Sequence, residues 1–274
     1  MTPKETYIRE VARLLTDFLA SGNTSDLLAY LVAESRLPGP RANLELAGAF
    51  SETVRAFAVA DPDDQQVLWN LCVELACISP EDAQAGDPHE FLVFCGVRGI
   101  GAIGSVSPAC AGKAVTHLAE ASADPRWQVR EAVAMAVQDL LSRQRDTAVP
   151  ELEGWVEGGS WLAMRAAVAG IAEPDLLAET DLAETALRLH RKTLIRVYMA
   201  KERQSEAFIA LKNVLGYTLS LVVAALPTIG FEYLRQLATL DDLDIRWIIR
   251  ENLETDRLRE RYPETVQHIR AQVG

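Results

Sequence analysis

The sequence has few of the residues from which catalytic and metal sites are usually built. It contains four histidines in 274 residues, and none has a histidine or cysteine three or four positions away, as ligands on a helix would require. There is also no Gly-x-Ser-x-Gly elbow and no Gly-Lys-Ser/Thr phosphate loop. We therefore expect no metal site and no cofactor, and the absences favour a protein that is not an enzyme.

Cysteine pairs and secretion signals are missing as well. The four cysteines form no Cys-x-x-Cys pair and lie in apolar stretches, which indicates buried, reduced thiols. The first residues are charged and amphipathic, unlike a basic segment followed by an apolar block. We expect a cytoplasmic protein that folds without disulfides.

No hydrophobic run is typical of a membrane span. The longest uncharged stretch covers residues 213–231, where Asn213, Thr218 and Ser220 dilute the apolar residues and Pro227 interrupts them. We expect a buried helix here and no membrane partner. With 49% hydrophobic residues, the chain is long enough to bury a large core.

Basic residues are outnumbered. The chain carries 27 lysines and arginines against 39 acidic residues, which gives a net charge of -12. Phosphate backbones attract positive surfaces, so this balance disfavours nucleic acid as a partner, although a local basic patch can override the average.

Strand signals are also absent, whereas helical ones recur. There is no sustained alternation of apolar and polar residues and no Asn-Gly or Asp-Gly turn. Apolar residues instead repeat every three or four positions, as in Ile8, Val11, Leu15 and Phe18. The pattern predicts an all-α protein.

Several helices are predicted to begin where a side chain with an oxygen precedes proline. Such a side chain accepts a hydrogen bond from a free amide of the first turn, and proline has no amide to leave unpaired there. The polar stretch 79–87 is predicted to be a loop or a boundary between lobes. The predicted starts are Thr2-Pro3, Asp61-Pro62, Asp87-Pro88, Ser107-Pro108 and Asp124-Pro125.

One segment recurs along the chain. Residues 124–130, Asp-Pro-Arg-Trp-Gln-Val-Arg, reappear at 244–250 as Asp-Ile-Arg-Trp-Ile-Ile-Arg, and a weaker copy ends at Arg165. Arg130 and Arg165 are separated by about one helix pair. The motif resembles that of bacterial HEAT-like repeat proteins, in which the second helix opens with Asp-Pro-x-Trp-x-Val-Arg. The resemblance covers roughly residues 87–262.

The resemblance implies a right-handed α-solenoid of stacked antiparallel helix pairs. We expect a HEAT-like repeat stack over residues 87–274, forming one continuous domain, and an N-terminal helical cap or lobe over residues 1–80.

The motif residues have a structural interpretation in such a stack. The aspartate is expected to cap the second helix, the arginine to reach the turn or an acid of the next repeat, and the tryptophan to fill the space between helix pairs. The residues are Asp124, Trp127, Arg130, Arg165, Asp244, Trp247 and Arg250.

Residues 99–104 match the dinucleotide fingerprint Gly-x-Gly-x-x-Gly, but their context does not fit. Pro108 falls where the phosphate-binding helix would continue, and apolar residues recur every third position through the stretch. We interpret the glycines as positions of close packing on a helix.

A basic stripe stands out in this acidic chain. On a helix, Arg188, Lys192 and Arg196 share one face, with Arg191 beside them. The stripe is a candidate site for phosphates or an acidic partner. The alternative, which we favour, is a solvated face neutralising the acids at 179, 181 and 184.

Two functional hypotheses follow from these features. The first is a non-enzymatic scaffold that presents a long helical surface to another protein. The alternative is a helical-repeat nucleic-acid-binding protein, or a DNA repair protein similar to the alkylpurine DNA glycosylases, that uses the basic stripe and the motif arginines.

Overall fold

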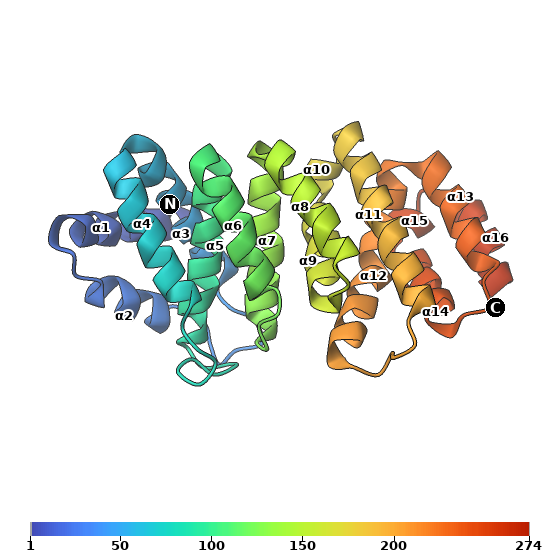
Figure 1. Cartoon of the computed structure of the whole chain (residues 1–274), viewed down its shortest axis with the longest axis horizontal. Helices are drawn as coiled ribbons and strands as arrows, with labels where there is room; N and C mark the ends of the chain where they lie inside the picture. The colour runs from blue at the N-terminus through green and yellow to red at the C-terminus, as the bar shows by residue number, and fades with distance from the viewer. Residues whose placement is uncertain (1, 274) are drawn as a thin grey trace. The chain divides into compact units, whose positions relative to one another are not determined.

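The computed structural model describes residues 2–273, and in this range the regular secondary structure is entirely α-helical (Figure 1). The prediction of an all-α protein is confirmed. The helices form two compact units, one up to Ala148 and one from Val149 onward. The division lies inside helix α8 (Arg145–Glu157), and the loop predicted at 79–87 lies within the first unit.

The first unit is built around one helix. Helix α5 packs against α3, α4, α6 and α7, and α1 continues the row beyond α3. The rows α1, α3, α5, α7 and α4, α6 therefore form two layers, with the core between them. The helices are α1 (Pro3–Ser21), α2 (Ser25–Ala33), α3 (Leu44–Ala60), α4 (Pro62–Ala76), α5 (Glu90–Val106), α6 (Pro108–Ala121) and α7 (Trp127–Arg143).

Glycines allow the neighbours of α5 to approach closely. A Cβ on Gly96 would lie 2.5 Å from the backbone nitrogen of Ala76 on α4, and one on Gly101 would lie 2.5 Å from the Cβ of Ala136 on α7. The interpretation of the glycine-rich stretch as a tightly packed helix is confirmed. The fingerprint glycines meet protein atoms where a nucleotide would have to bind.

One carboxylate links three helices of the row α3, α5, α7. Asp139 on α7 accepts a hydrogen bond from Arg55 on α3 at 2.6 Å and forms an ion pair with Arg98 on α5 at 3.0 Å. All three side chains are mostly buried. Burial lowers the pKa of Arg98, and Asp139 opposes that shift.

The second unit also has a central helix. Helix α12 packs against α9, α11, α13 and α14. Helices α9, α12 and α14 form a row. Helix α11 packs against all three members of this row, and α13 packs against α12, α14 and α16 (Figure 1). The helices are α9 (Trp161–Ile171), α10 (Pro174–Leu177), α11 (Thr180–Met199), α12 (Glu206–Ala225), α13 (Pro227–Ala238), α14 (Leu243–Leu253), α15 (Asp256–Arg259) and α16 (Pro263–Val273).

Among the described residues, α12 is the one helix long and apolar enough to cross a membrane. More than half of its apolar window is buried inside the protein, and the chain breaks at Leu226 before Pro227 starts α13. The expectation of a buried helix interrupted by proline is confirmed.

A buried asparagine fastens α14 to α12. The Asn252 amide donates to the carbonyl oxygens of Leu215 and Ile248, both at 2.7 Å, and its side-chain oxygen accepts from the Ser220 amide at 2.6 Å. All of its hydrogen-bonding groups in this position are used, so the polar side chain fixes the register between the two helices.

The predicted helix starts are correct at three positions and displaced at two. Thr2 forms a capping box, Asp61 caps α4, and α6 begins at Pro108 after Ser107. The predicted cap is wrong at Ser107, whose hydroxyl donates to the side chain of Gln65 instead. At Asp87-Pro88 and Asp124-Pro125 the helix begins two or three residues later, at Glu90 and Trp127. In both places the aspartate closes a short turn by accepting from the amide two residues on, before the helix starts.

His190 makes the second unit sensitive to acid. Its ring is buried, and it donates from Nδ1 to the Ala186 carbonyl at 2.8 Å, because that oxygen can only accept. Nε2 is then the acceptor, 3.0 Å from the Thr218 hydroxyl. Burial lowers the pKa of His190 from 6.5 to about 4, so the folded protein keeps the ring neutral where the unfolded chain would protonate it.

We therefore expect His190 to contribute full stability above its unfolded pKa and to lose it as the pH falls from 6.5 towards 4. Between pH 7.5 and 5 the loss from this group is about 2 kcal/mol. Urea unfolding across that range measures it, with His190→Gln expected to flatten the dependence. The exposed His268→Gln should keep the wild-type slope; equal slopes in all three proteins would show that the His190 ring is not held neutral.

Candidate functional site

The basic stripe lies on α11, and its cations are partly paired across to α8. The Arg188 guanidinium lies 2.8 Å from Glu153, and the Lys192 ammonium lies 2.6 Å from Glu157. Lys192 lowers the pKa of Glu157 by its hydrogen bond and its charge. Both pairs are exposed, so each contributes little to stability.

The acids that neutralise the stripe are not the predicted ones. We expected the carboxylates at 179, 181 and 184, but Arg188 and Lys192 pair with Glu153 and Glu157, each 35 residues earlier in the chain. The predicted solvated, neutralised face is therefore correct for these two cations, and the partners were wrong because they come from a neighbouring helix.

The other cations of the stripe have no carboxylate partner among the described residues. Arg196 donates to the backbone carbonyl of Glu157 at 3.3 Å. The Arg191 guanidinium lies over the ring of Tyr233 on α13, 4.8 Å from its centroid. Burial raises the pKa of Tyr233, and Arg191 opposes that shift. These arginines keep their positive charge available at the surface.

Apolar side chains are interleaved with these cations. On α11, 56% of Ile195 and 70% of Met199 is exposed, and Tyr198 is about half exposed. A groove of about 350 Å³ runs between α11 and α13 beside them. Its lining is Arg191, Leu194, Ile195, Tyr198, Tyr233, Gln236, Leu237 and Leu240.

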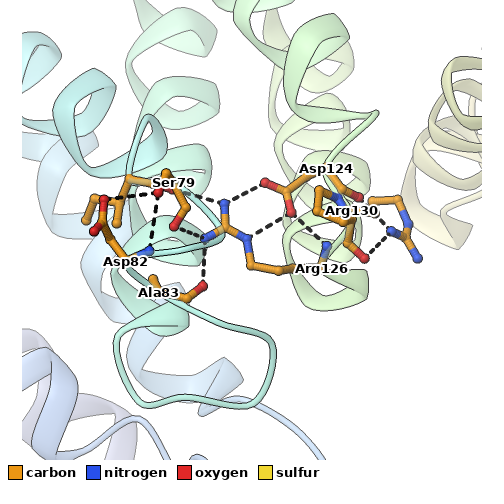
Figure 2. Close-up of polar contacts among 8 residues, drawn as sticks. Ser79, Asp82, Ala83, Asp124, Arg126 and Arg130 are labelled. Carbon is orange, nitrogen blue, oxygen red and sulfur yellow. Dashed lines mark hydrogen bonds and ion pairs between the residues drawn. The ribbon is translucent and has the colours of Figure 1, made fainter.

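The first copy of the repeated motif is a clamp centred on Arg126, a residue that sequence reasoning did not single out. Its buried guanidinium donates to the carbonyl oxygens of Ile78 and Ala83 and forms an ion pair with Asp124 at 2.6 Å. Figure 2 shows it lying between the loop that contains Ser79 and the start of α7. Arg126 thereby holds the loop between α4 and α5 against α7.

Arg130 behaves as predicted and Asp124 only in part. Arg130 donates to the carbonyl oxygens of Asp124 and Pro125, at 2.6 and 2.9 Å, so it does reach the turn (Figure 2). Asp124 was expected to cap the helix, but Arg126 occupies the N-cap position of α7. The aspartate closes the preceding turn instead, and its second role is to bind Arg126.

The second copy sits differently on its helix. Helix α14 begins at Leu243 with Asp242 as its cap, so Asp244 lies in the first turn and the predicted cap is wrong by two residues. Asp244 pairs with Arg203 and Lys212, both at 3.0 Å. Burial opposes ionisation of this carboxyl, but the hydrogen bonds and charges of Lys212 and Arg203 together outweigh it and lower the pKa of Asp244. Arg203 also donates to the Tyr198 and Ala200 carbonyl oxygens, and so ties the loop after α11 to α14.

The two tryptophans of the motif have different environments. Trp247 is partly buried on α14, where its ring packs on Gly216 of α12 and under the Lys212 ammonium, as an inter-helix filler should. Trp127 was expected to do the same, but 47% of it is exposed. The two differ because they occupy different positions on their helices: Trp127 is the first residue of α7, whereas Trp247 lies in the second turn of α14.

Trp127 borders a pocket in the first unit. The pocket has a volume of about 260 Å³, and half-exposed Leu44 lies on its rim with Trp127. Its other lining residues are Arg41, Ala42, Phe94, Gln128, Glu131 and Met135.

The remaining motif arginines do not form a common surface within the second unit. Arg165 is buried in α9, whereas Arg250 is exposed on α14. No group of three or more metal-ligating side chains occurs among residues 2–273.

No known family model and no curated protein matches the chain. Among solved structures it is similar to the crystal structure of an engineered protein, a Northeast Structural Genomics Consortium target. That chain is 15% identical with a TM-score of 0.38, over 95% of this chain and 97% of that one. Similarity at this level supports no argument about function.

Proposed function

We propose that this protein is a non-enzymatic scaffold of the HEAT-like type, a right-handed α-solenoid of stacked antiparallel helix pairs that binds another protein. The layered packing within each unit supports the repeat architecture, because helices that are not consecutive in the chain contact one another in rows such as α3, α5, α7 and α9, α12, α14. Residues 1–80 reach α5 through α3 and α4, as a cap would.

The observation that carries the binding role is the exposure of large apolar side chains beside grooves. Trp127 and Leu44 border the pocket of the first unit, and Ile195 and Tyr198 border the groove of the second. Single exposed apolar residues are common, but aromatic and aliphatic groups gathered at a concave site mark surfaces that become buried on binding.

Site-specific photo-cross-linking tests this role. A benzophenone amino acid in place of Trp127 or Tyr198 should capture defined proteins in cells that make this chain. The matched control is Val59, which is 65% exposed on α3 and borders neither groove. Capture that is equal from all three positions, or absent from Trp127 and Tyr198, would contradict a scaffold that binds through these surfaces.

The alternative function is nucleic-acid binding, including repair of the alkylpurine DNA glycosylase type. It is favoured by Arg191 and Arg196, which have no carboxylate partner among the described residues. It is disfavoured by the net charge of -12 and by burial of Arg165, which removes one motif arginine from contact with phosphates.

Fluorescence anisotropy separates the two functions. We expect labelled duplex and single-stranded DNA to show no salt-sensitive binding, with the double variant Arg191→Glu and Lys192→Glu equal to wild type. This variant should lose less than about 1 kcal/mol of stability, because both side chains are near the surface. Steep salt-dependent binding that the variant abolishes would establish the nucleic-acid function, since counterion release produces that slope.

A further inference from the structure

The surface of α11 in the second unit combines three features that together indicate a binding surface. It has exposed apolar side chains at helical spacing, a groove alongside them, and cations at its edges. We call it the α11 surface and define it by Arg191, Ile195, Arg196, Tyr198 and Met199.

The strip is long enough to seat a helix. Tyr198 and Met199 follow Ile195 at intervals of three and four on α11, and Arg191 lies one turn before Ile195, so the four side chains form a strip about 12 Å long at 1.5 Å per residue. The groove beside the strip is lined by Leu194, Leu237 and Leu240. A separate hollow of about 300 Å³ between α11 and Val156 on α8 also has Ile195 in its lining. A partner helix could place about two turns along the strip, at about 5.4 Å per turn.

The charge at the edge of the strip is positive. Arg191, Arg196 and the exposed Lys201 have no carboxylate partner among the described residues. Two nearby acids already form ion pairs: Glu157 pairs with Lys192, and Glu232 on α13 pairs with Arg235. Exposed Glu202 offsets one positive charge beside Lys201.

From this arrangement we infer that the α11 surface binds an acidic amphipathic helix of a partner protein. The apolar side of that helix fills the groove between α11 and α13, and its aspartates and glutamates lie against Arg191 and Arg196. Nucleic acid fits less well, because Ile195 and Met199 place aliphatic groups among the cations and Tyr198 is the one aromatic ring among the residues that define the surface, whereas single strands bind on successive stacking rings.

This inference deepens the proposed function, since it specifies the partner for one of the two surfaces. The scaffold function and the assignment of a partner helix to the α11 surface can fail separately. A partner held only at the Trp127 pocket would leave the scaffold role in place and remove the α11 assignment.

A displayed library of random 20-residue peptides tests the assignment and does not require the natural partner to be identified first. The full-length protein is the bait, and the double variant Ile195→Glu and Arg196→Glu is the counter-selection. We expect the peptides that bind wild type alone to be acidic, with apolar residues spaced at three and four. Enriched peptides that are basic or lack this period, or no peptides that distinguish the two baits, would overturn the assignment.

The selected peptides are then measured by fluorescence anisotropy. Ile195→Glu should raise the Kd at least about tenfold, as expected for a central contact residue, and Arg196→Glu should raise it mainly at low salt. The matched control Val59→Glu should leave the Kd unchanged. A labelled 20-nucleotide single strand is the competing probe: if it binds wild type and Ile195→Glu equally, the surface recognises charge alone and the assignment is wrong.

Circular dichroism checks that the variants are folded and that the peptides form helices. Both side chains are exposed on α11, so the variants should fold as the wild type does. The selected peptides themselves should gain helix on binding, and peptides that bind in an extended form would contradict the inference.

Discussion

Replacing Arg126 with methionine is expected to lower the free energy of unfolding of the first unit by about 3 to 5 kcal/mol, the range for breaking a buried ion pair by removing one partner. The guanidinium is almost fully buried, and it donates to the carbonyl oxygens of Ile78 and Ala83 as well as to Asp124. Methionine fills similar space but leaves these acceptors without donors. Urea unfolding followed by circular dichroism measures the loss.

The matched control is Arg250→Met. Arg250 occupies the end of the second motif copy and is exposed on α14, so its loss should change stability by less than about 0.5 kcal/mol. Equal, small effects of both substitutions would show that the loop at 78–83 does not depend on the clamp.

Gly96→Ala is expected to destabilise the first unit by about 3 kcal/mol, at the upper end for overpacking. The added methyl group would lie 2.5 Å from the Ala76 backbone nitrogen and 2.7 Å from the Cys72 carbonyl oxygen on α4. Backbone atoms cannot rotate away, so α4 and α5 must separate. The midpoint of thermal unfolding, measured with the same protein concentration for each variant, reports the effect.

Gly112→Ala, in the same unit, is expected to have the opposite effect on stability. Gly112 lies in α6, and a Cβ there meets no atom within 4 Å. The substitution should therefore stabilise by about 0.5 to 1 kcal/mol, because alanine favours the helix without a clash. If Gly96→Ala behaved like Gly112→Ala, the close approach of α4 to α5 would be wrong.

The helices and the packing of α5 were predictable because they depend on local spacing. Apolar periodicity and proline positions are read within a few residues, and the glycines of 96–104 lie on one segment. The clamp was not predictable, because Arg126 binds carbonyl oxygens of residues 43 and 48 positions earlier. Every residue has a backbone carbonyl oxygen, so the sequence does not show which of them accepts a hydrogen bond from a distant arginine.

The candidate site was predictable only in outline. The basic residues of α11 were visible in the sequence, whereas their acidic partners on α8 and the groove formed with α13 depend on how helices pack. The motif likewise indicated Trp127 and Trp247 as equivalent. A shift of a few residues in the start of α7 relative to α14 is enough to leave one tryptophan at the surface.

The placement of the cysteines provides a reporter that is already present in the protein. All four lie in the first unit, and the second has none. Burial raises the pKa of the Cys72 thiol to about 12, and it also raises that of Cys95. Cys77 is exposed and Cys110 partly exposed, so the prediction of four buried thiols is wrong for these two. An alkylating reagent therefore modifies Cys77 in the native state and reaches Cys72 and Cys95 only when α4 and α5 come apart. The rate of that slow modification follows opening of the first unit alone, so the stability of this unit can be measured in the intact chain without separating it from the second.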